Sequence, residues 1–383
     1  MSAERMKKKI MIVVPYLYDG GAERVASIWA SELARDGHYD VHLLTYYRLE
    51  KEYELDSNVK RSSILNDVIV TDSVANDYGK IDCVPTITKI LYIRKYIKEY
   101  KIDVVIPFLD YPGVHCSLAC FFNNNVKVVH TMRNNPWVFP KGLKKNVRDF
   151  FIKKDGYLIV QTEDQSLYYK NYKNLKYFVV PNPINRFCEQ IEKQYKGQLE
   201  KIISIGRLSL YQKNQGMIIE VVKKLNKQGI SVLVDIYGDG PDKDKLSNMI
   251  KDNGLEKQIH LMGNSKDILN IEVQYDLFLM TSFFEGFPNS LLEAMAEGMP
   301  VISTNCKTGP NSMIINEKNG YLVEINDVEQ VCNLIINLKK NPNKLEEIGM
   351  NARKTVFERF STHKVVDDLK RVVSIIVDET WCN

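Results

Sequence analysis

The sequence predicts an α/β protein with two Rossmann-like domains, each built on a doubly wound parallel sheet. Two observations lead to this prediction. Almost purely apolar runs alternate with amphipathic helical patterns, and the whole alternation restarts in the second half of the chain. Parallel strands read as continuous apolar runs because helices cover both of their faces. At 383 residues, the chain is long enough for two domains that each have a core.

The first half opens with the apolar run KIMIVVP at residues 9–15, which predicts a strand, and with helical spacing over residues 22–35. Four further apolar runs predict strands of the same sheet, with helical patterns between them. They cover residues 40–45, 104–108, 126–130 and 157–162. We expect these segments to form an N-terminal domain over residues 1–184.

The pattern restarts after the sequence PNP at residues 181–183. A polar stretch up to residue 200 predicts a hinge, and we expect a C-terminal domain over residues 185–361. Its strands are expected at residues 201–206, 231–237, 258–262, 276–280 and 300–304, with a helix over 214–228. The amphipathic stretch 362–378 predicts a last helix, within residues 362–383, that crosses back to the first domain.

Composition excludes several classes of protein. No apolar run approaches the roughly 18 residues that span a bilayer, and the start MSAERMKKK lacks the apolar stretch of a signal peptide. The seven cysteines include no C-x-x-C pair, which predicts neither a disulfide framework nor a zinc site. We therefore expect a cytoplasmic protein. The net charge of +4 is too small to indicate nucleic acid as a partner.

The most informative stretch is TSFFEGFPNSLLEAMAEGMPVIST at residues 281–304. The run DLFLM before it predicts a buried strand, and LLEAMAEG predicts a short helix that ends at Gly298. Unpaired N–H groups at such a helix N-terminus can hold an anion. Glu285 in the turn and Glu293 on the helix can bind hydroxyl groups on both sides of a phosphate. Together these features predict a nucleotide-sugar site.

Two cations follow the first strand of the second domain. Arg207 comes directly after the strand and Lys213 lies six positions further on, before a helix. Open α/β folds bind ligands at the carboxyl ends of their strands. Arginine can hold a diphosphate with two hydrogen bonds and lysine can act as a point charge beside it. Surface cations are usually solvated, but this position favours a binding role.

Gly20 and Gly21 end the loop after the first strand and precede a helix, where a backbone without side chains can approach a ligand closely. A tight turn between strand and helix is an equally good interpretation. The spacing is not G-x-G-x-x-G, which argues against a dinucleotide site.

His130 and Asp110 each stand at the end of an apolar strand. A histidine there can hydrogen-bond a sugar hydroxyl in a cleft, or it can be satisfied by its own loop. We favour the functional interpretation for His130, and Asp110 has less support.

The segment LKKNVRDFFIKK at residues 143–154 places Leu143, Val147, Phe150 and Phe151 on one helical face and basic residues on the other. Such a helix can lie on a membrane. More often it packs against its own sheet, which is the interpretation we favour. A mild basic excess in the first half of the chain, +6 over residues 1–190 against −2 over the rest, is compatible with contact with anionic lipid.

The chain resembles the retaining glycosyltransferases of the GT-B fold, in glycosyltransferase family 4 (glycosyl transferases group 1), over nearly its full length. The segments that carry the resemblance are GGAERV at 20–25, VVPNPI at 179–184, IGRLSLYQKN at 205–214, GDGPDKDKL at 238–246 and EGFPNSLLEAMAEGMPVIST at 285–304. The last of these is the most specific.

The resemblance implies two domains that face each other across a cleft, with the acceptor on the N-terminal side and the nucleotide sugar on the C-terminal side. Arg207 and Lys213 would bind the diphosphate, Glu293 the ribose and Glu285 the transferred sugar. It implies Arg207, Lys213, Glu285 and His130 as catalytic residues. The implied donor-binding residues are Gly20, Gly21, Arg207, Lys213, Gly286, Phe287, Asn289, Ser290 and Glu293.

The function that the resemblance implies is transfer of a hexose or 2-acetamido-hexose from a nucleoside-diphosphate sugar to a glycan or lipid-linked acceptor of the cell envelope. UDP is the favoured nucleotide, and TGPNSMI at 308–314 is similar to members that transfer galactose-type or 2-acetamido sugars. We expect acceptor residues in variable loops at 46–85 and 133–145. The protein would work in the cytoplasm, peripheral to the inner face of the plasma membrane.

No Asp-x-Asp motif follows a strand, so we predict that catalysis needs neither a metal ion nor a cofactor. Three alternatives remain at this point. One is a GT-B sugar-nucleotide epimerase, and another is a non-catalytic nucleotide-sugar-binding subunit. The third, an NAD-dependent oxidoreductase, is disfavoured by the missing glycine fingerprint.

Overall fold

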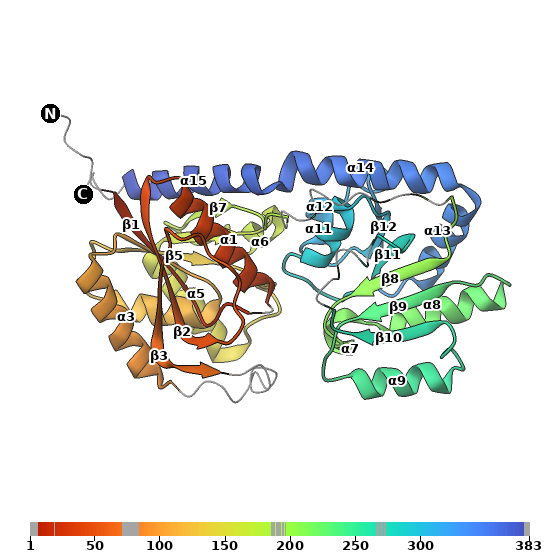
Figure 1. The fold of residues 1–383 in the computed structure, drawn as a ribbon, viewed down its shortest axis with the longest axis horizontal. Coiled ribbons are helices and arrows are strands. Elements are labelled where there is room, and N and C mark those ends of the chain that lie inside the picture. The colour runs from red at the N-terminus through yellow and green to blue at the C-terminus, as the bar shows by residue number, and fades with distance from the viewer. Residues whose placement is uncertain are drawn as a thin grey trace. The chain divides into compact units, whose positions relative to one another are not determined.

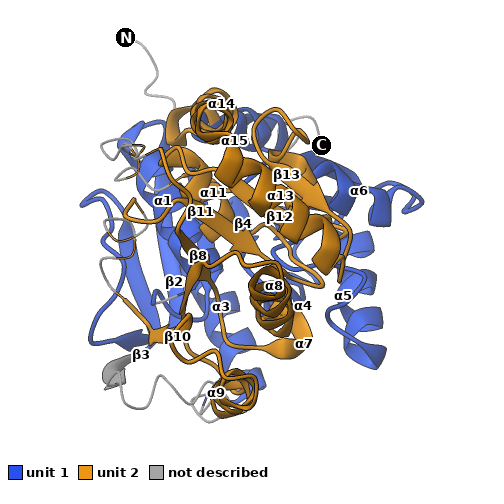
Figure 2. Ribbon diagram, turned by 90° about the vertical axis from the view of Figure 1, so that its right-hand side faces the viewer, with its two compact units in different colours: residues 1–181, 365–383 blue, residues 182–364 orange. Residues whose placement is uncertain are grey.

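The computed structural model describes residues 7–18, 20–70, 84–184, 188, 193, 195, 197–265, 268, 271 and 273–378. The chain forms two compact units, which Figure 2 distinguishes by colour. Unit 1 contains residues 1–181 and 365–383, and unit 2 contains residues 182–364. Each unit is built on one parallel sheet with helices packed against it (Figure 1). The predicted α/β fold with two Rossmann-like domains is confirmed.

Unit 1 holds a seven-stranded sheet in the order β3-β2-β1-β4-β5-β6-β7. Its strands are β1 Lys8–Val14, β2 Tyr39–Leu49, β3 Lys60–Val70, β4 Val104–Pro107, β5 Lys127–Thr131, β6 Tyr157–Val160 and β7 Lys176–Val179. All paired strands are parallel. The strand order reverses between β1 and β4, and the loops after these two strands therefore open at the switch point of the sheet.

The helices of unit 1 cover both faces of this sheet. They are α1 Gly21–Arg35, α3 Thr86–Tyr100, α4 Asp110–Ala119, α5 Gly142–Asp155, α6 Glu163–Tyr169 and α15 Thr362–Asp378, which begins in unit 2 and continues into unit 1. α1 and α15 share a core with Ile10 and Ile12 of β1. α3 and α4 pack on the opposite face, against Met11 and Val13. α5 packs beside α4 on that same face, through Ile152 against Leu158 of β6.

The last helix, expected at residues 362–378, is α15, and its buried side chains Val365, Leu369 and Val373 belong to the core of unit 1. The chain passes from unit 1 to unit 2 between residues 181 and 182 and returns between residues 364 and 365. The two connections are hydrogen-bonded to each other. The amide of Ile184 donates to the carbonyl of Phe360 at 2.9 Å, and the hydroxyl of Thr362 donates to the carbonyl of Ile184 at 3.1 Å.

Unit 2 holds a six-stranded parallel sheet in the order β10-β9-β8-β11-β12-β13. Its strands are β8 Lys201–Ile205, β9 Leu233–Tyr237, β10 Ile259–Gly263, β11 Leu277–Met280, β12 Val301–Thr304 and β13 Tyr321–Val323. Its helices are α7 Leu210–Lys213, α8 Gly216–Lys227, α9 Lys243–Asp252, α11 Asn289–Ala296, α12 Pro310–Met313, α13 Val328–Lys340 and α14 Pro342–Phe360. The strand order reverses between β8 and β11.

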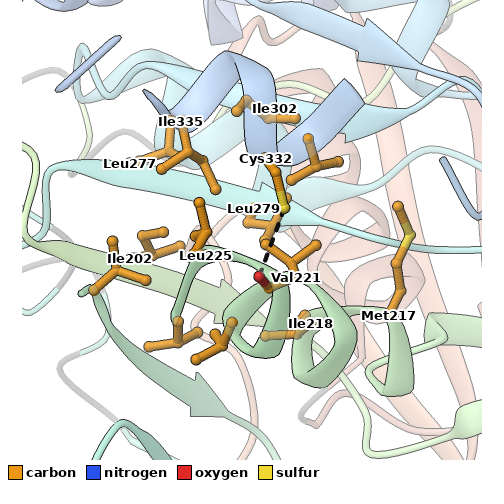
Figure 3. Close-up of a cluster of buried hydrophobic side chains, with 14 of the residues drawn as sticks. Ile202, Met217, Ile218, Val221, Leu225, Leu277, Leu279, Ile302, Cys332 and Ile335 are labelled. Atoms are coloured by element: carbon orange, nitrogen blue, oxygen red, sulfur yellow. Dashed lines mark hydrogen bonds between the residues drawn. The ribbon is translucent and has the colours of Figure 1, made fainter. Parts of the chain in front are cut away.

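The core beneath this switch point is dense. Figure 3 shows α8 presenting Ile218, Val221 and Leu225 to Leu277 and Leu279 of β11, all of them almost fully buried. The thiol of Cys332 on α13 lies 3.6 Å from the carbonyl oxygen of Val221 and ties the two helices together. The strands that carry the loops of the site are thus held by close-packed side chains, which deform little.

Part of the region expected as an acceptor loop, residues 46–85, is a strand. β2 continues to Leu49, and β3 runs over Lys60–Val70 as the edge of the sheet. Its sequence KRSSILNDVIV mixes polar and apolar residues, so it does not read as a buried strand. Residues 71–83 lie outside the described residues. β7 and β13 are also strands that the apolar pattern did not predict.

α5 packs against its own sheet, as favoured from the sequence, but not through the expected face. Phe151 is buried, whereas Leu143 and Phe150 are 77% and 56% exposed. The buried face contains the polar residues Arg148 and Asp149, which pair with each other. Of the helices within the described ranges, none combines the length and apolar character that crossing a bilayer requires.

Candidate functional site

The strongest candidate site lies at the carboxyl edge of the unit 2 sheet, at the switch point between β8 and β11. Lys213 ends α7 in the loop after β8, and Glu285 stands in the loop after β11. Because β8 and β11 are neighbours in the sheet, these two loops meet although 72 positions separate the two residues. Open α/β sheets bind ligands in the crevice at such a point.

Lys213 and Glu285 form an ion pair in which Nζ lies 2.6 Å from Oε1. The two side chains are 16% and 6% exposed, so both charges are largely withdrawn from water. The hydroxyl of Ser282 donates to the same carboxylate oxygen at 2.6 Å. A buried carboxylate is stable only when it is paired and hydrogen-bonded, and Lys213 and Ser282 meet that need.

The two loops are also joined through their backbones. Thr281 donates its hydroxyl to the carbonyl of Lys213 at 2.9 Å, and the amide of Phe283 donates to the carbonyl of Gln212 at 2.8 Å. The ammonium group of Lys213 therefore reaches the site from a backbone that is anchored to the loop carrying Glu285. This anchoring fixes the point of the loop from which the Lys213 side chain extends.

Arg207 occupies a different position in the same loop. Its side chain is exposed, and its carbonyl oxygen accepts a hydrogen bond from Nε2 of Gln215 at 2.9 Å. The amide of Leu210 donates to Oδ2 of Asp242 at 2.8 Å, which holds the following turn. The structure thus brings Lys213 to Glu285 and leaves the guanidinium of Arg207 at the surface of unit 2.

The remaining donor-site residues of unit 2 follow Glu285 in one loop and helix. Gly286 and Phe287 lie in the loop, and α11 begins at Asn289, whose side-chain oxygen accepts a hydrogen bond from Asn182 at 2.7 Å. Ser290 donates its hydroxyl to the carbonyl of Ile205 at the end of β8, at 3.2 Å. The N-terminus of α11 therefore lies over the end of β8, where its N–H groups can serve an anion.

Glu293 lies on the second turn of α11 and is buried, with 7% of its surface exposed. It shares α11 with Asn289 and Ser290, so the helix carries all three predicted contacts as one rigid element.

Three residues of the site were not predicted from the sequence. Ser282 binds the carboxylate of Glu285, Thr308 donates to the carbonyl of Glu285, and Thr281 binds the carbonyl of Lys213. Thr281 and Ser282 follow β11 directly, and hydroxyl residues directly after a buried strand are the signal that could have indicated them. Thr308 lies in a segment that the sequence related only to sugar specificity.

The loop after β12 closes the site from one side. Gly309 has φ of 97°, and a Cβ atom there would lie 2.5 Å from Cδ of Pro288 and 3.3 Å from the carbonyl oxygen of Gly286. Only glycine permits both this conformation and this approach. Burial raises the pKa of the neighbouring Cys306 to about 12, with the charge of Glu285 adding to the effect. That thiol is therefore not a nucleophile at neutral pH.

His130 belongs to unit 1 and is buried at the end of β5. Its Nε2 atom lies 2.9 Å from Oδ2 of Asp155 and 3.1 Å from the hydroxyl of Ser117. A carboxylate can only accept, so this contact places the proton on Nε2. Burial alone would raise the pKa of Asp155, but the hydrogen bond and charge of His130 and the hydrogen bond of Ser117 lower it below 3.8. Asp155 thus fixes the ring.

Asp110 begins α4 directly after β4, next to Leu109, whose φ and ψ of 75° and 163° are a conformation that residues other than glycine rarely adopt. Burial raises the pKa of Asp110, against the opposing charges of Arg148 and His130. Backbone strain and a perturbed acid at the switch point of unit 1 are features that accompany functional sites.

Gly20 and Gly21 stand at the N-terminus of α1, with Gly20 as the cap residue. A Cβ atom on Gly20 would lie 1.7 Å from Oε2 of Glu23, so the absence of a side chain lets this carboxylate approach the start of the helix. Residue 19 lies outside the described residues. Gly20, Gly21, Asp110 and His130 belong to unit 1, and the other predicted site residues belong to unit 2.

Within the described part of the chain, no group of three or more His, Cys, Asp or Glu side chains is arranged to hold a metal ion.

Residues 188–355 match the family model described as glycosyl transferases group 1. The chain is 30% identical over 288 residues to a poly(ribitol-phosphate) alpha-N-acetylglucosaminyltransferase of Staphylococcus aureus; the match covers 73% of the chain and 56% of that relative's length. It is 27% identical over 401 residues to an Escherichia coli UDP-Gal:alpha-D-GlcNAc-diphosphoundecaprenol alpha-1,3-galactosyltransferase, with 97% of each chain covered.

Among solved structures, a variant of S. aureus TarM in complex with fondaparinux, alpha-GlcNAc-glycerol and UDP is similar with a TM-score of 0.75. The identity is 18%, and the match covers 95% of this chain and 99% of that one. These similarities confirm the GT-B fold and the family resemblance expected from the sequence.

We expect Gly309→Ala to lower the free energy of unfolding by more than the cost of placing alanine at a positive φ. The additional loss arises because the new methyl group would overlap Pro288. Gly229→Ala is the matched control. Gly229 also has a positive φ, of 72°, but nothing lies within 4 Å of an added Cβ atom. Thermal unfolding should show a loss of about 1–2 kcal/mol for the control and a larger loss for Gly309→Ala. Equal losses would contradict the close approach described here.

We expect Asp155→Asn to destabilise unit 1 by about 1–3 kcal/mol at neutral pH, because it removes a charged acceptor from His130 and Ser117. The folded pKa of Asp155 is lowered, so its stabilisation is complete above 3.8 and is lost as the pH falls through the folded value. Unfolding curves measured from neutral to acid pH should therefore converge. Glu99→Gln, at an exposed position of α3, is the control, and a difference that persists unchanged into acid would contradict this role.

Proposed function

We propose, from the premise that the chain belongs to the glycosyl transferases group 1 family, that it is a hexosyltransferase that uses a nucleoside-diphosphate sugar as donor. The observation that carries this proposal is the meeting of Lys213 and Glu285 at the switch point of the unit 2 sheet. The N-terminus of α11 lies over the end of the neighbouring strand β8. A cation and helix N–H groups can bind a diphosphate, and carboxylates can accept hydrogen bonds from sugar hydroxyls.

Lys213 is assigned to the diphosphate. Among the described residues, its ammonium group donates to Glu285, and an ammonium has three donors in all. When the bond from the anomeric carbon to the phosphate oxygen breaks, its electron pair stays on the phosphate, where negative charge grows. Lys213 and the N–H groups of α11 stabilise that charge, and electrostatic stabilisation of this kind commonly lowers the barrier more than any other effect. Arg207, exposed in the same loop, is assigned to the same diphosphate.

Glu285 is assigned to the transferred sugar and Glu293 to the ribose. Both carboxylates are buried, with Glu285 neutralised by Lys213. A neutralised carboxylate binds hydroxyl groups as an acceptor and is a poor nucleophile, so we assign neither residue to attack on the anomeric carbon. Gly286, Phe287, Asn289 and Ser290 complete the pocket with backbone and side-chain groups.

The proposed reaction retains the configuration at the anomeric carbon. The acceptor hydroxyl attacks on the face from which the phosphate departs, and its proton passes to the departing phosphate oxygen. The carbon exchanges one C–O bond for another, and no oxidant or metal ion enters the balance. On the N-terminal side, His130 is assigned to the sugar, with Gly20 and Gly21 beside the diphosphate.

The donor that we propose is a UDP-hexose or UDP-2-acetamido-hexose, and the acceptor is a glycan or lipid-linked oligosaccharide of the cell envelope. The activities for which the two relatives are named support both choices, since one acts on poly(ribitol-phosphate) and the other transfers galactose from UDP-Gal to a diphosphoundecaprenol-linked sugar. The TarM complex contains UDP. We place the reaction on the cytoplasmic side of the membrane.

We expect Lys213→Ala to lower kcat for sugar transfer by about 100- to 1,000-fold, which is the effect of removing one donor to a developing oxyanion. The assay is release of UDP from UDP-glucose, UDP-galactose and their 2-acetamido forms, with diphosphoundecaprenol-linked GlcNAc as acceptor. Lys223→Ala is the control, because Lys223 is also ion-paired, with Glu220 at 3.1 Å, but lies on the outer side of α8. EDTA should leave the wild-type rate unchanged.

Near-normal turnover by Lys213→Ala would contradict the role of this lysine. Loss of activity with EDTA and recovery with magnesium would contradict the metal-free reaction. An epimer formed from the donor alone would indicate a sugar-nucleotide epimerase instead. Binding of UDP without turnover of any donor would indicate a non-catalytic subunit.

A further inference from the structure

The outer face of α5 carries an apolar ridge that the core of unit 1 does not use. The ridge consists of Leu143, Val147 and Phe150, which lie three or four positions apart and therefore share one side of the helix. Leu143 is 77% exposed and Phe150 is 56% exposed. The opposite side of α5 anchors it, with Phe151 and Ile152 buried. The packing of α5 on the sheet therefore does not use the side chains of the ridge.

Lysines border the ridge on both sides, and each packs against an aromatic ring. Towards α4, Lys144 lies over the ring of Tyr111 at 5.6 Å and Lys154 over that of Phe121 at 4.7 Å. Towards α6, Lys145 lies over Tyr168 at 5.3 Å and Lys153 over Tyr172 at 4.2 Å. At 3.6 residues per turn, Lys144 and Lys153 flank the ridge and Lys154 lies between Leu143 and Val147, whereas Lys145 lies on the opposite side of α5. Lys154 also pairs with Asp155 at 3.2 Å. The ring contacts of Lys144 and Lys153 keep their ammonium groups beside the ridge.

The apolar surface continues at the end of α4. Phe121 and Phe122 follow this helix and are 38% and 88% exposed, with their rings 5.0 Å apart. Arg94 of α3 donates to the carbonyls of Leu118 and Ala119, both at 3.0 Å, so a further cation flanks this tip. α4 and α5 lie side by side on the same face of the sheet (Figure 2). Ridge and tip therefore belong to one surface.

We propose that this surface, made by the ridge and the Phe121–Phe122 tip with their flanking lysines, docks unit 1 on an anionic lipid bilayer. Lysines at the level of an exposed apolar ridge match negatively charged headgroups with acyl chains beneath them. A second copy of the chain would bring like charges together. A soluble polyanion would satisfy the lysines but leave Leu143, Phe150 and Phe122 in water. The bilayer is the partner that meets both needs.

Co-sedimentation with vesicles tests this proposal on the full chain without any sugar donor. The vesicles are phosphatidylcholine alone, or phosphatidylcholine with about a third phosphatidylglycerol. Wild-type protein should bind the anionic vesicles and not the neutral ones. Lys144→Glu with Lys153→Glu should weaken binding by more than about 25-fold, since each lysine contributes roughly fivefold. Leu143→Ser with Phe150→Ser should weaken it by about tenfold or more.

Two double variants in unit 2 are matched controls. Met262→Ser with Met350→Ser removes apolar side chains that are 47% and 59% exposed, and Lys251→Glu with Lys257→Glu reverses two exposed charges. Both should bind the vesicles like the wild type. Circular dichroism and binding of UDP, measured for every variant, separate loss of docking from loss of folding or of donor binding.

The proposal is overturned if the wild type fails to bind anionic vesicles or binds neutral ones equally well. It is also overturned if the lysine variant loses binding while the Leu143 and Phe150 variant keeps it. That pattern would identify the surface as a site for a soluble polyanion. Equal losses in the unit 2 controls would show a general charge effect and would likewise contradict a specific docking face.

Discussion

The site in unit 2 depends on one requirement, that the buried carboxylate of Glu285 must be neutralised. Lys213 and Ser282 meet it at 2.6 Å each, and both hold the same oxygen. Around this pair the fold supplies rigidity, since the loop after β8 is bonded to the loop after β11 through the backbone. Because removing one member of a buried pair leaves an uncompensated charge, the pair links the shape of the site to its chemistry. The positions of the loops after β8 and β11 and the neutralisation of Glu285 by Lys213 thus depend on each other.

The two units place polar groups at corresponding points of their sheets but stabilise them differently. In unit 2 a lysine neutralises the acid at the switch point. In unit 1 the acid next to the switch point, Asp110, is half-buried beside the strained Leu109, and the ring of His130 is fixed by Asp155. A fixed imidazole and an acid with a raised pKa suit contact with neutral hydroxyl groups, whereas a lysine beside a helix N-terminus suits a diphosphate. This division agrees with the donor and acceptor sides proposed for the two units.

The sequence predicted the features that depend on local pattern. The order of residues predicts the buried parallel strands and the restart of the alternation. It also predicts that Lys213 and Glu285 each follow one of those strands. The contact between these two residues is not predicted, because β9 and β10 intervene in the chain while β8 and β11 are neighbours in the sheet. β3 was not predicted because it is an edge strand that carries polar residues, and our criterion for a strand was a continuous apolar run. The face of α5 was misjudged because Arg148 and Asp149 are buried as a pair, which apolar periodicity cannot indicate.

The most direct measurement of the central claim is the crystal structure of the wild-type protein with UDP. The β-phosphate should lie within hydrogen-bond distance of Nζ of Lys213 and of the N–H groups at the start of α11, with the ribose hydroxyls on the carboxylate of Glu293. A diphosphate bound away from Lys213, with the ion pair to Glu285 undisturbed and the ribose on other groups, would contradict the assignment of this site.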